Sequence, residues 1–290
     1  MKSDFDIKDK DLIKEKHHPF RKLFFAIILI IILTIIYSRY LGTSGLIVKE
    51  YQIKSKNISE AYNGLKIAHF TDFHYGRTTF ISELKNLVTD INKTKPDIII
   101  FTGDLIDRDS KLTENEETKI SEELKKLNCT YGKYYVEGNH DIKFDKYNEI
   151  MTNAGFINLN NSHDVIYNNR GETILISGIS TKINNDFLKN IFAEGKNYNY
   201  KINIMHYPDY FDDIKTYNYD LVLAGHSHNG QINIPFYGPI IKPIHAQKYY
   251  APHYKIDNTD LYISSGIGVS EYNFRLFNRP SYNLYRLIKK

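Results

Sequence analysis

The sequence predicts an α/β fold in which two packed mixed β-sheets are flanked by helices and preceded by one transmembrane helix. Strand and helix patterns alternate in the first part of residues 65–290, and strand patterns dominate the second part. Alternation of this kind builds a sheet with helices on its faces, while a strand-rich half supplies a second sheet that packs against the first. A charge-free apolar run near the N-terminus predicts the additional helix.

The apolar run covers residues 23–37 and is flanked by Arg21, Lys22 and Arg39. As a helix with about 1.5 Å rise per residue, it is shorter than the ~30 Å hydrocarbon core of a bilayer. Residues up to 41 can extend it while the flanking cations reach the headgroups. Three interpretations compete: a cleaved signal peptide, an uncleaved anchor and a buried core helix.

We favour an uncleaved anchor over residues 23–41. A run that is apolar on every side lacks the amphipathic face of a core helix, and residues 37–42 match the Ala-x-Ala spacing of a cleavage site poorly. The basic leader over residues 1–22, with seven Lys/Arg and five Asp/Glu, is expected to stay in the cytoplasm by the positive-inside rule. This predicts a single-pass protein of the cell membrane whose body is extracytoplasmic. The cations at positions 39, 49, 54 and 56 oppose that orientation.

Composition limits the possible classes of function. The chain has 290 residues, of which 42% are hydrophobic, enough for one large domain and an appendage. Beyond residue 22, 31 Lys/Arg balance 29 Asp/Glu, so no broad basic face is expected and nucleic acid is not an expected partner. Cys129 is the only cysteine, which excludes an intrachain disulfide and a thiolate zinc cluster.

The first half of the body is expected to alternate between strands and helices. Residues 42–64 are expected to form a linker with a first strand at 47–53. Apolar side chains recur at helical spacing from Ile81 to Ile91, before Pro96, and the fully apolar run that follows reads as a central strand. After the linker we expect a strand at 65–70, a helix at 81–91, a strand at 98–101, a helix at 114–127 and a strand at 134–136.

The second half is richer in strands. We expect them at 165–167, 173–177, 201–205, 221–224 and 261–264, with short helices at 186–192 and 209–215.

Five short polar blocks follow predicted strands. In order they are Asp72-Phe73-His74, Gly103-Asp104, Gly138-Asn139-His140-Asp141, a lone His206, and Gly225-His226-Ser227-His228. Open α/β sheets place their sites past the carboxyl ends of strands, so these blocks are expected to meet. Their three oxygen ligands and four imidazoles fit two divalent metals held side by side, which implies hydrolysis of a phosphate ester.

The spacing within the blocks suits metal binding. Asp72 and His74 share one face of an extended chain and can reach one ion, as can His226 and His228. Asp104 follows an apolar strand and a glycine, and each of its carboxylate oxygens can take one metal. Mixed imidazole and oxygen ligands suit Mn, Fe or Zn better than Ca or Mg.

Taken together, the blocks resemble the calcineurin-like metallophosphoesterases over roughly residues 65–270. The matching patterns are DxH, GDxxD, GNHD, a lone His and GHxH. The stretches HFTDFHYG, PDIIIFTGDLID, VEGNHD and LVLAGHSHNGQINIPFYGP are similar to the membrane-associated phosphodiesterases of the YkuE/YaeI type. The resemblance implies an αββα sandwich and a metallophosphoesterase domain over residues 65–290.

The resemblance also implies a ligand set. A first metal is expected on Asp72, His74 and His228, a second on Asn139, His206 and His226, and a bridge through Asp104. In this family pattern, a bridging water acidified by two cations becomes hydroxide and attacks phosphorus in line.

The family pattern leaves His140 outside the ligand set. Its expected role is to stabilise developing charge or to protonate the leaving oxygen. Asp107 or Asp141 is expected to orient an imidazole from behind. Arg77, Arg275 and Arg279 are candidate phosphate clamps because guanidinium matches phosphate geometry, with ordinary surface charge as the alternative.

The segment 231–256 is rich in proline and aromatic residues. It could seat an apolar or glycosidic leaving group, rest on the bilayer surface, or form a structural lid, and His245 and His253 within it are open candidates for the cleft. Residues 251–254 depart from the glycine-containing sequence expected of the subgroup.

These inferences predict a phosphodiesterase or pyrophosphatase acting on lipid-linked or cell-envelope phosphates, with the bilayer as a partner and no obligate protein partner. One alternative is a membrane-tethered phosphatase or cyclic-nucleotide phosphodiesterase for soluble substrates. Another is a non-catalytic, metal-dependent binding protein. The presence of His140 beside all seven candidate ligands speaks against the last, because a binding protein has no need of a general acid.

Overall fold

The computed structural model describes residues 19–168, 170–192, 197–234 and 236–290. Of the predicted leader over 1–22, positions 1–18 lie outside the described residues. The chain divides into two compact units, Met1–Ile36 and Tyr37–Lys290.

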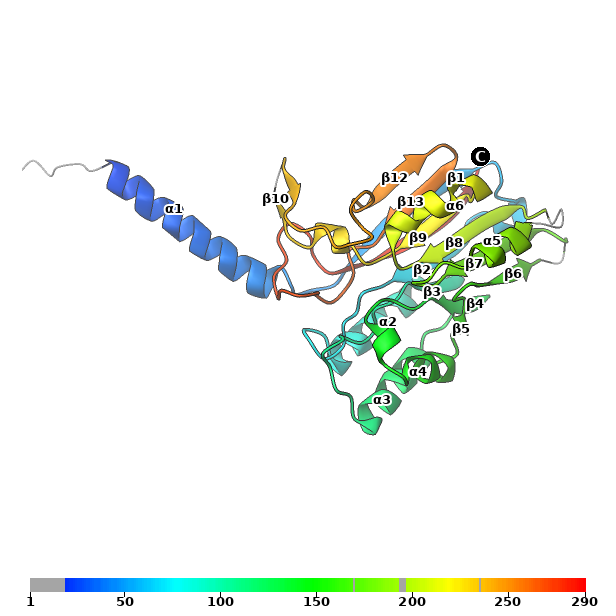
Figure 1. Ribbon diagram of the computed structural model, residues 1–290, viewed down its shortest axis with the longest axis horizontal. Helices are drawn as coiled ribbons and strands as arrows, with labels where there is room; N and C mark the ends of the chain where they lie inside the picture. Colours follow the sequence, from blue (N-terminus) through cyan, green and yellow to red (C-terminus); the bar gives the residue numbers. More distant parts are fainter. Residues whose placement is uncertain (1–18, 169, 193–196, 235) are drawn as a thin grey trace, which may run out of the picture. The chain divides into compact units, whose positions relative to one another are not determined.

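The described part of the first unit is one helix, α1 (Pro19–Ile36), shown in Figure 1. It is apolar over most of its circumference, and none of its residues is buried. The chain continues as a π-helical turn, Tyr37–Leu41, which belongs to the second unit. The 23 residues from Pro19 to Leu41 form a segment that is long and apolar enough to cross a bilayer. A signal sequence near the N-terminus meets the same criterion.

The described residues of the second unit form two six-stranded sheets and a two-stranded hairpin. The first sheet has the strand order β1 (Ile47–Ser55), β14 (Ser281–Lys289), β2 (Lys66–Phe70), β3 (Ile98–Phe101), β4 (Gly132–Tyr135) and β5 (Ile157–Asn158). The second has the order β12 (His253–Ile256), β13 (Thr259–Ile263), β9 (Leu221–Ala224), β8 (Tyr200–Met205), β7 (Thr173–Ile179) and β6 (Ser162–Tyr167). The hairpin pairs β10 (Asn233–Ile234) with β11 (Gly238–Pro239).

Both sheets are mixed. In the first, β14 is antiparallel to β2, and its other pairs are parallel. In the second, the edge strands β12 and β6 are antiparallel to their neighbours, and the inner pairs are parallel.

Alternation along the strands divides the core into layers. In β3, Ile98 and Ile100 face the second sheet, where they pack with residues such as Ile202 of β8. The neighbouring Ile99 and Phe101 face the opposite way, toward helices. This period-two pattern is what a strand buried on both faces requires.

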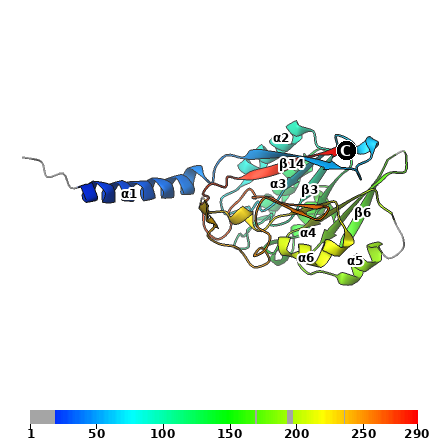
Figure 2. The ribbon, with the colours of Figure 1, turned by 90° about the horizontal axis from the view of Figure 1, so that it is seen from above.

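Helices cover the outer face of each sheet (Figure 2). The first sheet packs against α2 (Ile81–Thr94), α3 (Glu114–Lys125) and α4 (Tyr147–Asn153), and the second against α5 (Asn185–Phe192) and α6 (Phe211–Ile214). The α3 helix starts at a capping box, in which Thr113 and Glu116 bond each other's backbone N–H groups. The prediction of two packed mixed sheets flanked by helices is confirmed.

The structure differs from the sequence prediction at the first sheet's edge. Strand β14, which was not predicted, lies between β1 and β2 and pairs with both. Its polar residues Ser281 and Asn283 are buried and bonded, Asn283 Nδ2 donating to Tyr285 Oη at 2.7 Å. Because β1 joins the sheet through β14, residues 47–55 lie in the same compact unit as residues 65–290.

Candidate metal centre

The five polar blocks meet at one edge of the packed sheets. Strands β2, β3 and β4 are neighbours in the first sheet, and β8 and β9 are neighbours in the second. Asp72, Asp104, Asn139, His206 and His226 follow the carboxyl ends of these five strands in turn. The packing of two sheets therefore joins side chains that are far apart in the sequence.

The local backbone is strained where these blocks lie. Asp72, His74, Asp104, His226 and His228 all have φ between 47° and 65°, the left-handed region that non-glycine residues seldom adopt. Such conformations persist where the surrounding structure over-determines them, as it does at functional sites.

Glycines allow the blocks to approach one another. A side chain on Gly138 would collide with the carboxylate and the backbone nitrogen of Asp104, and one on Gly103 would collide with the backbone of Gly138. The two glycines therefore permit the close contact between the ends of β3 and β4.

One group of ligand atoms consists of Asp72, His74 and His228. The Nε2 atoms of His74 and His228 lie 3.2 Å apart, and His228 Nε2 lies 3.5 Å from Asp72 Oδ1. One ligand atom from each residue lies within 4.8 Å of the others, and all three residues are buried. The group has the size and chemistry to hold one metal ion.

A second group consists of Asp104, His206 and His226, again with ligand atoms within 4.8 Å of one another. Asn139 Oδ1 joins it at 3.1 Å from His206 Nε2. Asp104 Oδ2 lies 3.4 Å from His206 Nε2 and 3.8 Å from His74 Nε2. Asp104 is therefore positioned between the two groups.

Hydrogen bonds to backbone carbonyls define the tautomers of the His206 and His226 imidazoles. His206 Nδ1 lies 2.7 Å from the carbonyl of Thr102, and His226 Nε2 lies 2.8 Å from the carbonyl of Ile244. A carbonyl only accepts, so these nitrogens carry the hydrogens. In the neutral rings, His206 Nε2 and His226 Nδ1 keep a lone pair for a metal. His206, whose pKa is raised to about 9, must release its second proton before its Nε2 can bind one.

Burial and charge shift the pKa values of the site in opposite directions. Burial, reinforced by the charge of His206, lowers the pKa of His226 to about 3, and burial lowers that of His140 to about 4. Burial opposes ionisation of Asp104, but His206, His140 and His74 together hold its pKa well below the usual value. Burial also opposes protonation of His206, but Asp104 and Asp72 raise its pKa to about 9.

The two predicted orienting carboxylates have different positions. Asp107 Oδ2 lies 3.6 Å from His74 Nδ1 and 3.7 Å from His140 Nδ1, so it faces imidazoles. Asp141 instead accepts hydrogen bonds from backbone N–H groups, at 2.6 Å from Asp104 N and 2.9 Å from Gly138 N. Asp141 thus braces the loops after β3 and β4.

The expectation that Arg275 clamps phosphate does not agree with its position. Arg275 is 0% exposed, and its Nη2 lies 3.2 Å from His228 Nδ1. Its guanidinium donates to the carbonyls of Ser265, Gly266, Gly268 and Asn278. These four acceptors hold it beneath the site, away from the pocket.

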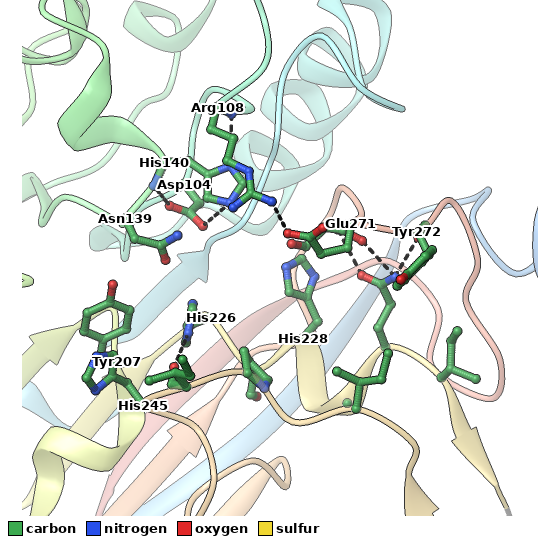
Figure 3. Close-up of a pocket in the computed structure, with 18 residues that line it drawn as sticks. Asp104, Arg108, Asn139, His140, Tyr207, His226, His228, His245, Glu271 and Tyr272 are labelled. Atoms are coloured by element: carbon green, nitrogen blue, oxygen red, sulfur yellow. Dashed lines mark hydrogen bonds and ion pairs between the residues drawn. The ribbon is translucent and has the colours of Figure 1, made fainter.

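The other candidate arginines also point elsewhere. Arg77 donates to Asp107 Oδ2 at 3.2 Å and to the Glu271 carbonyl at 2.9 Å. Arg279 donates to the carbonyl of Ser44. The arginine that lines the pocket is Arg108, which the sequence analysis missed and which is ion-paired with Glu271 (Figure 3). Its position directly after Asp107 in the GDxxD block was the available signal.

The pocket above the two groups has a volume of about 470 Å³. Its polar lining includes Asp104, Asn139, His140, His226 and His228, and Figure 3 shows Tyr207 and His245 side by side near His226. The pocket is also lined by apolar residues, which we call its apolar wall: Ile232, Ile241, Pro243, Ile244 and Tyr272.

The structure distinguishes His245 from His253, the two histidines that the sequence left as candidates for lining the cleft. His245 lines the pocket, with its ring 4.5 Å from that of Tyr207. His253 Nε2 lies 2.9 Å from Asp260 Oδ1, and its ring stacks on Tyr262. Within the segment 231–256, Pro235 lies outside the described residues.

Comparison with known proteins agrees with this geometry. The family model for the calcineurin-like phosphoesterases matches residues 65–230. YkuE of Bacillus subtilis (strain 168), named an uncharacterized metallophosphoesterase, is 31% identical over 255 residues, which are 87% of this chain and 88% of YkuE. The phosphodiesterase YaeI of Escherichia coli (strain K12) is 26% identical over 77% of this chain and 82% of YaeI.

A further relative is the UDP-2,3-diacylglucosamine pyrophosphatase LpxG of Chlamydia muridarum, 25% identical over 60% of this chain and 66% of LpxG. Metallophosphoesterases of this type use a dinuclear metal centre, and the His and Asp groups described above could bind metal. The resemblance inferred from the sequence motifs is thereby confirmed. The chain belongs to the calcineurin-like phosphoesterase family and is a metal-dependent phosphoester hydrolase.

Proposed function

We propose that the site holds two divalent cations of the Mn, Fe or Zn type and hydrolyses a phosphodiester or a pyrophosphate. The position of Asp104, within 3.4 Å of His206 and 3.8 Å of His74, is the observation that carries this proposal. Asp72, His74 and His228 hold one cation, Asn139, His206 and His226 hold the other, and Asp104 bridges them. When bound, two such cations supply a water that ionises near neutral pH and a Lewis acid at phosphorus.

We infer that His140 donates a hydrogen bond to the leaving oxygen and so stabilises the charge that develops there. Its Nδ1 accepts a hydrogen bond from the backbone N–H of Arg108 at 3.0 Å, so the neutral ring carries its hydrogen on Nε2. Burial lowers the pKa of His140 to about 4, which keeps the ring neutral at pH 7. Since His140 also lines the pocket, the Nε2 hydrogen is available to a bound substrate.

A lipid-linked or cell-envelope phosphate is the proposed substrate class. The pocket combines a polar, metal-binding part with an apolar wall, which suits a molecule with a phosphate at one end and an apolar group at the other. The names of two relatives, a phosphodiesterase and a diacylglucosamine pyrophosphatase, point in the same direction.

We also propose that α1 is an uncleaved anchor and that the Tyr37–Lys290 unit lies outside the cytoplasm. The length and apolar character of Pro19–Leu41 support an anchor, and the basic leader supports the orientation. The full chain should resist carbonate extraction from membranes, and protease added to spheroplasts should digest the second unit. A mature chain that starts near Gly42 would show cleavage instead.

The activity is tested with the full chain in detergent and added Mn. Aryl phosphomonoesters, aryl phosphodiesters and lipid pyrophosphates are compared as substrates, and bound metal is measured by elemental analysis. We expect about two metals per chain, as proposed above, with preference for diesters or lipid pyrophosphates. Preference for monoesters or cyclic nucleotides would indicate a tethered enzyme for soluble substrates. Bound metal without any turnover would indicate a binding protein.

A further inference from the structure

The mouth of the pocket carries an exposed apolar rim, which we define as Phe236, Tyr237, Ile240, Ile241, Ile244 and Phe277. We propose that this rim enters the interface of the same bilayer that holds α1, so that the pocket opens toward lipid. The proposal rests on the proposed membrane anchoring and adds a second, separate membrane contact to it.

The rim is more exposed than folding alone requires. Phe236 is 111% exposed, Ile244 75% and Phe277 66%. Scattered apolar residues are normal on a protein surface, but a contiguous group around a cleft indicates a binding surface. Ile241 and Ile244 also line the pocket, so the rim is continuous with the apolar wall of the site.

Backbone hydrogen bonds tie the rim to the segment that follows α1. Arg275 N donates to the Ser38 carbonyl at 2.9 Å. The next residue, Leu276, bonds Gln231 and Asn233 at 3.2 and 3.0 Å, which connects it to the β10–β11 hairpin. Because Tyr37 directly follows α1 in the chain, the rim is anchored to the point where the apolar helix ends.

Exposed apolar side chains also occur in the segment that directly follows α1. Tyr40 is 66% exposed and Leu41 62% exposed, and both belong to the same compact unit as the rim. In the sequence, these two exposed apolar side chains follow the end of α1 within a few residues.

The charges near the rim suit an anionic lipid surface. Residues 231–256 contain Lys242, Lys248 and Lys255 and no Asp or Glu. Lys248 and Lys255 are ion-paired with Asp212 and Asp260, so Lys242 is the cation proposed to meet the lipid surface. The Lys242 ammonium lies 3.8 Å from the centre of the Tyr250 ring, which holds it on this side of the pocket. Aromatic and aliphatic side chains with a nearby lysine are typical of segments that lie in the headgroup region.

The experiment uses the full chain with Cys129→Ser, which removes the only cysteine. A single cysteine then replaces either Phe236 or Tyr167 and is labelled with an environment-sensitive dye. Tyr167 is the matched control, because it is an aromatic residue that is 67% exposed, on β6 at the opposite end of the unit from β10 (Figure 1). Each labelled chain is reconstituted into vesicles of phosphatidylcholine with or without phosphatidylglycerol.

We expect blue-shifted emission and quenching by brominated lipid at position 236, several-fold stronger than at position 167. Anionic vesicles should give the larger effect. A label at 236 that is quenched only by aqueous iodide, in chains retained after carbonate washing, would overturn the proposal. Protection from both quenchers together with cross-linked dimers would also overturn it, because a second copy would then cover the rim.

Failure of the underlying proposals gives different results. Loss of the chain from vesicles on carbonate washing would refute the anchor and, with it, the rim contact. Absence of hydrolysis in a chain whose label at 236 is quenched by lipid would refute the enzymatic proposal alone. Hydrolysis of bis(p-nitrophenyl) phosphate in detergent checks that each labelled chain is folded. If the change at Phe236 reduces this hydrolysis, the label is placed at Ile240 instead.

Discussion

Replacing Arg275 with methionine is expected to destabilise the protein strongly, because its guanidinium is structural. The side chain is 0% exposed and donates to four backbone carbonyls. Methionine donates to none of them, and each buried acceptor left without a partner costs ~1–3 kcal/mol. Allowing for partial rehydration, we expect a loss of about 3–5 kcal/mol, as for other broken buried charge contacts. For a unit of this size, that corresponds to a fall in Tm of about 6–20 °C.

The change should also reach the metal centre. The loop held by Arg275 donates a hydrogen bond from Gly268 N to the Asp72 carbonyl at 2.8 Å, and Arg275 itself contacts His228 at 3.2 Å. We therefore expect Arg275→Met to lose affinity for the metal held by these two residues. Calorimetry gives Tm, and elemental analysis after dialysis against graded chelator gives metal retention.

Arg108→Met is the matched control. Arg108 lines the pocket and is 36% exposed, so losing its ion pair with Glu271 should cost only about 0–1 kcal/mol, while KM for a phosphodiester rises. If Arg275→Met instead kept the wild-type Tm and metal content and raised only KM, Arg275 would be a phosphate clamp and the structural argument would fail.

Three further outcomes test the site and the core. Asp104→Asn should lower both metal content and kcat, since a neutral amide bridges two cations poorly; two metals and wild-type turnover in this variant would contradict the ligand assignment. His140→Ala should keep its metals but slow turnover by about 10²–10⁴-fold, with a smaller loss for nitrophenyl esters, and loss of a metal would make His140 a ligand. Burial lowers the pKa of His69 to about 3 from 6.5. Below pH 6.5 the unfolded chain therefore binds a proton that the folded chain does not. The free energy of unfolding decreases as the pH is lowered, and at pH 5 it is about 2 kcal/mol smaller than at pH 8. Urea unfolding of metal-free wild type and His69→Leu at both pH values measures this; equal pH dependence would exclude a contribution from His69.

Elements with strong local patterns were predicted closely. The apolar run 98–101 is strand β3 (Ile98–Phe101), and the helical spacing from Ile81 to Ile91 lies within α2 (Ile81–Thr94). Both signals are local, because alternation or helical periodicity within a few residues already specifies which face is buried. Strand β14 lacks such a signal: its buried Ser281 and Asn283 read as surface residues until β1 and β2 enclose them.

The candidate ligands were identifiable because their motifs are short and follow strand ends. The residues around them were not, since their roles depend on where a long side chain or a distant loop ends. Asp107 and Asp141 look equivalent in the sequence, yet Asp107 faces His74 and His140, and Asp141 bonds backbone N–H groups.

By itself, the sequence determined the α/β class, the apolar helix near the N-terminus and the family, because strand-end motifs and hydrophobic periodicity are local properties. Only the tertiary structure decided which arginine reaches the pocket and which exposed residues form the rim. Arg108, Arg275 and Phe277 lie in loops whose positions are set by contacts with segments far away in the chain, such as Ser38 with Arg275 and Gln231 with Leu276. Long-range packing has no short sequence pattern, and so the surroundings of the site emerge only when the two sheets come together.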